Sequence, residues 1–242
     1  MSSAASAILT KGQLLFAAPE PVTVPIAGRS ELFPVHRIYC VGRNYEDHAK
    51  EMGFTGREPP FFFMKPADSL LVVEEGAVGA MPYPTLTKNL HHEIELVVAL
   101  GRGGRDIKAA DAMALVFGYA VGLDMTRRDL QNQMKKEGRP WEIGKAFELS
   151  APMGPITPMN EVPDIGSAAI ALAVNGSVRQ KGAISQLIWS IAETIEHLSA
   201  AWELRPGDLI FTGTPEGVGP VVSGDLLDGT IEGLTDLRVR VD

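Results

Sequence analysis

The residues best suited to chemistry lie in one apolar stretch, residues 91–100, which reads His-His-Glu-Ile-Glu-Leu-Val-Val-Ala-Leu. Alternate side chains of a strand share a face, so Glu93 and Glu95 are expected to point the same way, roughly 7 Å apart along the strand. Two carboxylates on an apolar strand are unfavourable unless a counter-charge neutralises them, and a hard cation such as Mg²⁺ would do so. From these two residues alone, a half-exposed strand with two solvated glutamates remains the alternative.

A third acid, Asp124, ends the apolar run 116–124, close to a glycine. Three carboxylates with open coordination positions suit Mg²⁺ or Mn²⁺ better than Zn²⁺. The zinc-protease pattern H-E-x-x-H does not occur in the sequence. His91 and His92 are therefore interpreted as structural or hydrogen-bonding neighbours of the acids.

His48 and Glu51 are three residues apart, so on a helix they share a face. Glu51 could then hold the imidazole in one tautomer and leave it as a base for a water molecule near neutral pH. The same spacing also fits an ordinary surface pair, and the spacing alone does not decide between them.

Two further stretches favour an anionic ligand. Lys145 lies in mostly apolar sequence, and a lysine is seldom buried without a partner, so it is expected to face a cavity that holds an anion. The glycine-rich residues 212–219 offer backbone N–H groups and hydroxyls to such a group. They do not match the phosphate-binding Walker pattern, and the sequence contains neither a dinucleotide fingerprint nor a G-x-S-x-G nucleophile motif.

Composition limits the class of protein. The 242 residues are 45% hydrophobic and 21% charged, with a net charge of −8, which is typical of a globular protein. Binding to nucleic acid or to an anionic membrane needs a basic face and is not expected. The single cysteine, Cys40, excludes an intrachain disulfide and fits a reducing cytoplasm; no secretory signal and no bilayer-spanning run is recognised.

Short strands dominate the expected structure. An Asn-Gly turn at 175–176 predicts a hairpin between runs 168–174 and 177–184. Alternation over residues 235–242 predicts a half-buried terminal strand. The remaining strands are expected at residues 36–42, 61–64, 69–73, 91–100, 116–124 and 208–212.

One long helix is expected over residues 186–203, capped by Ser185 and with an apolar stripe at helical spacing. Shorter helices are expected at residues 108–115 and 126–137. Strands and helices do not alternate regularly, which argues against a doubly wound sheet. The sequence therefore predicts a mixed α/β, mostly β architecture, with one domain over residues 35–242 after an extended leader, residues 1–34.

Six motifs occur in this order along the chain: Gly42-Arg43-Asn44-Tyr45, His48-x-x-Glu51, Phe62-Phe63-Met64-Lys65-Pro66, Glu93-x-Glu95, Gly122-Leu123-Asp124-Met125-Thr126 and Phe211-Thr212-Gly213-Thr214-Pro215. Taken together, they resemble the fumarylacetoacetate hydrolase superfamily over residues 35–242. Within that superfamily, residues 60–67, 90–100 and 117–131 are most similar to fumarylpyruvate hydrolases of the gentisate route of aromatic breakdown.

The resemblance implies a mixed β-roll, a homodimer and a divalent metal, Mg²⁺ or Mn²⁺. The metal ligands it implies are Glu93, Glu95 and Asp124. It implies that His48 and Glu51 form a water-activating pair on a short helix that orders over the site as a lid. It gives Lys145 a role at the oxo-acid end of the substrate, and it gives further substrate contacts to Arg128, Gln131 and Thr214.

The implied activity is hydrolysis of the C–C bond of a 2,4-dioxo acid, with fumarylpyruvate giving fumarate and pyruvate. Two alternatives stay open at this point. The first is an oxaloacetate decarboxylase, or a hydrolase of another acylpyruvate, on the same site. The second is a non-catalytic binding protein that keeps the fold, against which the complete set of acids, His48 and Lys145 argues.

Overall fold

The structure is a computed structural model that describes residues 14–45, 57–162 and 164–242. His48 and Glu51 lie outside the described residues. None of the helices in the described ranges is long and apolar enough to cross a membrane.

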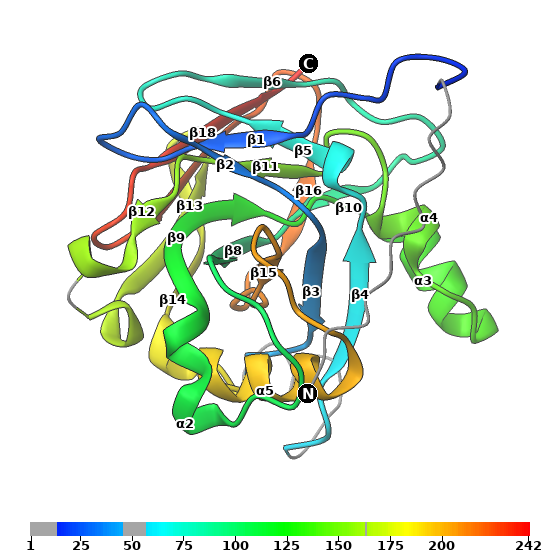
Figure 1. The fold of residues 1–242 in the computed structure, drawn as a ribbon. Coiled ribbons are helices and arrows are strands. Elements are labelled where there is room, and N and C mark those ends of the chain that lie inside the picture. Colours follow the sequence, from blue (N-terminus) through cyan, green and yellow to red (C-terminus); the bar gives the residue numbers. More distant parts are fainter. Residues whose placement is uncertain (1–13, 46–56, 163) are drawn as a thin grey trace.

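A large mixed sheet forms the centre of the fold (Figure 1). Strand β15 pairs with β3 in parallel and with β8 in antiparallel orientation, so segments far apart in sequence become neighbours. The strand order is β4 (Phe61–Lys65), β3 (Ile38–Gly42), β15 (Leu209–Phe211), β8 (Ile94–Leu100), β9 (Val116–Leu123), β11 (Ala151–Met153) and β5 (Leu70–Val72), with β12 (Thr157–Pro158) paired to β9.

Three smaller sheets complete the β structure. A five-stranded sheet has the order β14 (Ser177–Ala183), β13 (Ala169–Val174), β17 (Leu226–Ile231), β18 (Leu237–Val241) and β6 (Gly79–Met81). A three-stranded sheet has the order β10 (Thr126–Arg127), β7 (Leu90–His92) and β16 (Gly219–Val221). Strands β1 (Thr23–Pro25) and β2 (Leu32–Pro34) form the last. The mixed, mostly β fold expected from the sequence is confirmed.

Strand β8 is buried on both faces, because two hydrophobic clusters pack against it. Leu96, Val98 and Leu100 belong to one cluster, whereas Val97 and Ala99 belong to the other. Period-two alternation therefore divides this strand between two cores rather than between core and solvent. The alternative of a half-exposed strand is wrong.

The sequence predicts one strand over residues 91–100, but the structure contains two. These residues divide at Glu93 into β7, which joins the three-stranded sheet, and β8, which joins the central sheet. The chain changes sheets at this residue, because β7 pairs with β10 and β16 while β8 pairs with β9 and β15.

The long helix is shorter than expected. Helix α5 (Ile191–Ala201) begins after Ser190, whose side chain accepts a hydrogen bond from the backbone N–H of Glu193. The expected start at Ser185 is wrong, because the Asn44 side chain binds the Trp189 N–H and C=O and the Asn44 carbonyl accepts from the N–H of Ile188. These contacts hold residues 187–190 outside the helix, between the 3₁₀ turn η5 (Ile184–Gln186) and α5.

The other helices are short. Helix α3 (Arg128–Glu137) ends at Gly138, which has φ of +65°. It lies beside α4 (Glu142–Lys145) on the outside of β4 in Figure 1. The remaining helical segments of the described residues are α2 (Ala109–Ala112), η1 (Ala67–Ser69), η2 (Met113–Leu115), η3 (Met159–Glu161) and η4 (Ile165–Ser167).

The hairpin and the terminal strand expected from the sequence are confirmed. Asn175 and Gly176 have φ of +51° and +77°, the conformation of a two-residue turn that matches strand twist. Side chains of β18 alternate between buried and exposed.

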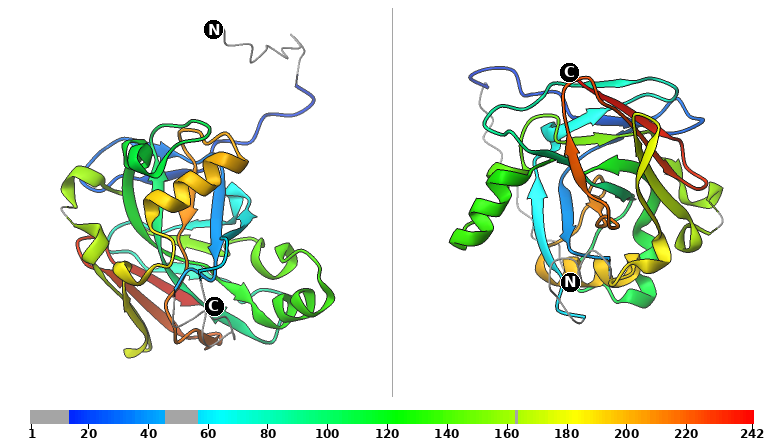
Figure 2. Two further views of the ribbon diagram at one scale, coloured as in Figure 1. Left: turned by 90° about the horizontal axis from the view of Figure 1, so that it is seen from below. Right: turned by 180° about the vertical axis from the view of Figure 1, so that it is seen from behind.

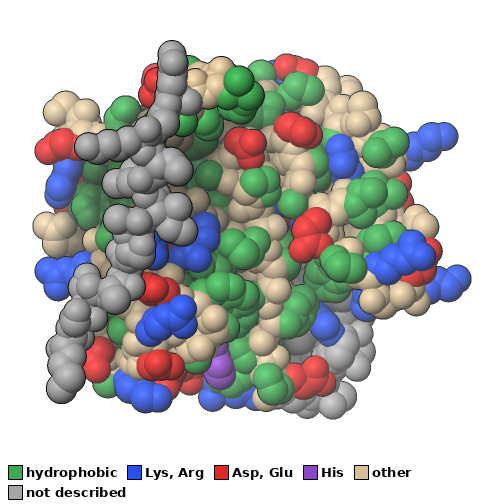
Figure 3. Space-filling view, turned by 45° about the vertical axis from the view of Figure 1, so that its right-hand side comes forward, with side chains coloured by type: hydrophobic (Ala, Val, Ile, Leu, Met, Phe, Trp, Pro, Cys, Tyr) green, Lys and Arg blue, Asp and Glu red, His purple; other side chains and the backbone are tan. Residues whose placement is uncertain are grey.

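The first residues of the described chain include a paired segment. Val24 and Phe33, from β1 and β2, are buried in one of the two hydrophobic clusters. Residues 14–20 lead away from the body of the fold (Figure 2). On the face shown in Figure 3, acidic, basic and hydrophobic side chains are interspersed.

Candidate metal centre and its cavity

Strand register brings the three acids together. In the antiparallel pair β8–β9, Ile94 lies opposite Leu123 and Glu95 lies opposite Gly122. The pairing extends one residue beyond the strands, to Glu93 before β8 and Asp124 after β9, because the Asp124 N–H donates to the Glu93 carbonyl at 2.8 Å. Asp124 is thereby placed beside both glutamates.

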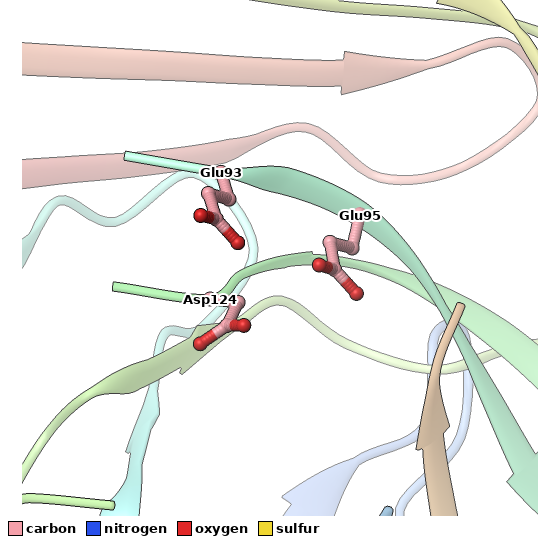
Figure 4. Close-up of side chains that lie close together, drawn as sticks. All are labelled: Glu93, Glu95 and Asp124. Atoms are coloured by element: carbon pink, nitrogen blue, oxygen red, sulfur yellow. The ribbon is translucent and has the colours of Figure 1, made fainter. Parts of the chain in front are cut away.

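The three carboxylates form one buried cluster (Figure 4). One oxygen from each of Glu93, Glu95 and Asp124 lies within 4.8 Å of the others. The residues are 5%, 2% and 1% exposed, respectively. A cluster of three buried carboxylates carries excess negative charge that water cannot screen, so it needs cations.

Lys145 supplies one of these cations. Its Nζ donates to Glu93 Oε2 at 2.8 Å, to Asp124 Oδ2 at 2.6 Å and to Thr126 Oγ1 at 2.8 Å. Burial lowers the pKa of Lys145, but the neighbouring Asp124 and Glu93 outweigh this effect and raise it above its ordinary value. The side chain is therefore a charged ammonium in contact with two of the three acids.

Lys65 is a second buried cation at the cluster, and the sequence analysis gave it no role. Its Nζ lies 2.9 Å from Asp124 Oδ1 and donates to Ser150 Oγ at 2.9 Å and to the Lys145 carbonyl. A lysine that ends the apolar strand Phe-Phe-Phe-Met-Lys is the signal that could have identified it, because such a position is buried.

Glu95 differs from the other two acids in its partners. The Gly213 N–H donates to Glu95 Oε2 at 2.8 Å, and among the described residues no ion pair to Glu95 is found. Burial raises the pKa of Glu95 well above its usual range, and the adjacent Asp124 and Glu93 add to the effect. Among the described residues, the side of the cluster at Glu95 therefore lacks a cationic side chain in contact with the carboxylate.

Side chains expected to contact substrate line, together with the three acids, a cavity of about 30 Å³. Arg128 donates to Glu93 and, through Nη1 at 2.5 Å, to Gln131 Oε1. Thr214 and Trp141 form other parts of the lining. The structure thus brings Arg128, Gln131, Lys145 and Thr214 to the same cavity as the three acids.

The two histidines contact neighbours of the cluster. Arg128 Nε lies 3.4 Å from His91 Nδ1, and His92 Nδ1 lies 2.9 Å from Gln180 Oε1. Burial lowers the pKa of His91 to about 4, with Arg128 adding to the effect, and burial also lowers that of His92. Both rings are therefore neutral near pH 7.

This arrangement suits two kinds of ligand at once. Three carboxylates that each offer one oxygen are the donor set that a hard divalent cation prefers. The ammonium of Lys145 and the guanidinium of Arg128 add positive charge for an organic anion bound above them. Such a site can bind an anion and stabilise negative charge that develops on it.

Comparison with known proteins agrees with this geometry. The model of the fumarylacetoacetate hydrolase C-terminal domain matches residues 37–242. Fumarylpyruvate hydrolase of Pseudomonas aeruginosa, solved in complex with Mn²⁺ and pyruvate, has a TM-score of 0.93 and 57% identity, over 95% of this chain and 99% of that one.

Two curated relatives carry different activities. Fumarylpyruvate hydrolase of Ralstonia sp. is 46% identical over 76% of this chain and 93% of its own length. The mitochondrial oxaloacetate tautomerase of Mus musculus is 45% identical over 84% of this chain and 90% of its own length. On the family model and on this identity over most of its length, the chain belongs to the fumarylacetoacetate hydrolase family and is a hydrolase.

Proposed function

We propose that this enzyme hydrolyses the C–C bond of a 2,4-dioxo acid, and that fumarylpyruvate, an intermediate of gentisate-type aromatic degradation, is its substrate. The observation that carries the proposal is the buried cluster of Glu93, Glu95 and Asp124 with Lys145 between two of them, at the base of a cavity. The names of two relatives support the choice of substrate.

The residues present fit a divalent metal. Three carboxylate oxygens converge, and burial together with the adjacent Asp124 and Glu93 raises the pKa of Glu95, as expected for a carboxylate that lacks a cation partner. We propose that Glu93, Glu95 and Asp124 hold Mg²⁺, with Mn²⁺ as the alternative, since oxygen ligands distinguish weakly between the two. When bound, the metal supplies Lewis-acid stabilisation for an enolate.

The protein groups then have separate tasks. Thr214, Arg128 and Gln131 hold the 2-oxo acid end, and Lys145 adds positive charge beside it. His48, oriented by Glu51, takes a proton from a water molecule, whose oxygen forms a bond to the 4-carbonyl carbon. The C3–C4 bond breaks, its electron pair passes to the pyruvate enolate, and protonation at C3 gives pyruvate. Lys145 stabilises the negative charge that develops on the enolate, and this stabilisation makes the carbanion an acceptable leaving group.

The test is turnover with products identified. We expect fumarylpyruvate to disappear in the presence of Mg²⁺ or Mn²⁺, with fumarate and pyruvate formed in equal amounts, and we expect a chelator to stop the reaction. A short acylpyruvate serves as the matched substrate without the second carboxylate. Absence of pyruvate among the products would contradict the proposal.

Oxaloacetate chemistry is the second candidate, because a tautomerase of oxaloacetate is 45% identical to this chain. Tautomerisation and decarboxylation both pass through an enolate and would use the same acids and Lys145. The same assay with oxaloacetate separates the candidates: enol–keto exchange, or carbon dioxide release, as the only fast reaction would move the enzyme to this branch.

A further inference from the structure

A buried amide from the neighbouring sheet contacts the cavity lining. Gln180, on β14 of the five-stranded sheet, is 0% exposed and lies outside every motif considered in the sequence. Its side chain reaches the three-stranded sheet at His92 and the glycine-rich loop after β15 at Thr214. It therefore connects parts of the chain that are 88 and 34 residues away from it.

The backbone is shaped to allow this reach. The register of the β13–β14 pair shifts where Leu172 lies opposite Gln180 and Ala173 lies opposite Val178, so Arg179 is the extra residue of a bulge. A bulge re-aims the neighbouring side chains, and here Gln180 is buried whereas Val178 is 64% exposed. Gly217 (φ +89°) lets the loop pass close to β14, since a Cβ there would lie 2.1 Å from the Arg179 carbonyl.

Two backbone groups fix the orientation of the Gln180 amide. Its Oε1 lies 3.1 Å from the Ile94 N–H, which can only donate, and its Nε2 lies 2.8 Å from the Pro215 carbonyl, which can only accept. The amide therefore cannot be reversed without two clashes of like groups. The second hydrogen of Nε2 points to Thr214 Oγ1 at 2.8 Å, so Thr214 is the acceptor in that contact.

This contact decides what the Thr214 hydroxyl can do. A hydroxyl that accepts from Gln180 keeps one proton to donate elsewhere, and Thr214 lines the cavity above the acids. On the other side of the amide, His92 Nδ1 donates to Oε1, since Oε1 can only accept. All four hydrogen-bonding positions of the Gln180 side chain are used.

We propose that Gln180 is a positioning residue for substrate: its amide holds the Thr214 hydroxyl as a donor directed into the cavity, where that hydroxyl binds a carboxylate oxygen of the ligand. This inference rests on the proposed function, in which Thr214 holds the acid end of a 2-oxo acid. It makes the site selective for an acceptor group, because a donor placed there would face another donor.

Pyruvate is the probe, titrated calorimetrically into the Mn²⁺-loaded enzyme. For Gln180→Met we expect the dissociation constant of pyruvate to rise about tenfold, the value of one hydrogen bond to a charged group, with unchanged Mn²⁺ affinity. For Gln180→Glu we expect a larger rise, because a carboxylate accepts the Thr214 proton and removes it from the cavity. With substrate, the change should fall on KM and not on kcat. Gln133→Met, on the surface of α3, is the matched control and should bind pyruvate as the wild type does.

A double-mutant cycle distinguishes positioning from loss of packing. In a Thr214→Val background, Gln180→Met should cause no further loss of pyruvate affinity, since the donor is already absent. An equal tenfold loss in both backgrounds would overturn the inference while leaving the proposed function intact. Should the Gln180 variants not fold, Thr214→Val and Thr214→Ser decide: equal pyruvate affinity of the two would overturn it. No pyruvate binding by the wild-type enzyme would overturn the inference and the proposed function together.

Discussion

Strand β15 has a buried acid at each end, and the two acids have different surroundings. Asp208, directly before the strand, is 0% exposed and accepts from His36 Nδ1 at 2.7 Å, from Arg37 at 3.1 and 3.2 Å, and from the Arg205 N–H at 2.8 Å. Glu95, which the Gly213 N–H contacts just after the strand, belongs to the cluster of three acids.

The difference separates a structural acid from one that we propose as a metal ligand. The hydrogen bonds to Asp208 tie the start of β3 to the turn before β15, and Arg37 supplies its counter-charge. At the other end, burial is the largest cause that raises the pKa of Glu95, and the adjacent carboxylates of Asp124 and Glu93 raise it further. Burial of a carboxylate is common to both places, so burial alone does not distinguish them; the excess of like charge around Glu95 is what makes it the candidate for function.

Removing a ligand from the cluster should have the largest effect. For Asp124→Asn we expect kcat/KM to fall by about a thousandfold or more, because binding of the metal and charge stabilisation are lost together. The measurement is turnover of fumarylpyruvate beside calorimetric titration with Mn²⁺. Asparagine keeps the shape of the aspartate side chain. It therefore limits the loss of stability that results when Lys65 and Lys145 lose their carboxylate partner. A variant that binds Mn²⁺ and turns over normally would show that Asp124 is not a ligand.

The matched change at the other end of β15 should affect stability instead. Asp208→Asn removes the counter-charge of Arg37 and weakens four hydrogen bonds, so we expect the free energy of unfolding to fall by about 2–3 kcal/mol. Activity per folded molecule and Mn²⁺ affinity should stay as in the wild type. Urea denaturation measures the free energy of unfolding. A loss of Mn²⁺ binding in Asp208→Asn would abolish the distinction between the two acids.

A neutral replacement of Glu95 should stabilise the metal-free enzyme. Glu95→Gln removes one of three like charges, and we expect Tm in chelator to rise by about 2–6 °C, equivalent to about 1–2 kcal/mol in a protein of this size. Added Mn²⁺ should raise the Tm of the wild type but hardly that of the variant, since a ligand stabilises only the state it binds. Equal Mn²⁺-induced shifts in the two proteins would remove Glu95 from the metal site.

The smallest effect is expected at Asp129, a well-paired acid at the start of α3. Thr87 Oγ1 at 2.6 Å and the Lys88 N–H at 3.0 Å donate to it; burial opposes ionisation, but these hydrogen bonds outweigh it and lower the pKa of Asp129 below its ordinary 3.8. A lowered pKa means that the stabilisation is complete above pH 3.8 and is lost as the pH falls through the lower value of the folded protein. Asp129→Asn should cost about 1 kcal/mol at pH 7. In denaturation curves below pH 3.8, the difference in the free energy of unfolding between the variant and the wild type should shrink. A difference that stays constant would argue against a lowered pKa of Asp129.

The sequence determined the acids and the fold class. Short apolar runs ended by glycine and proline predicted a mostly β structure, and the motif set around Glu93, Glu95 and Asp124 predicted the family, which the match over residues 37–242 confirmed. Local periodicity sufficed for the hairpin at Asn175-Gly176 and for the alternating terminal strand, because both depend on neighbouring residues.

Only the tertiary structure decided which side chains meet. The break at Glu93, the helix start at Ser190 and the contact of Lys65 with Asp124 all arise from segments 59 to 145 residues apart that compete for the same backbone or charge. Gln180 is the clearest case, since a bulge on another sheet brings it to Thr214. Sequence periodicity describes which face a residue occupies on its own strand, whereas sheet pairing fixes what that face touches.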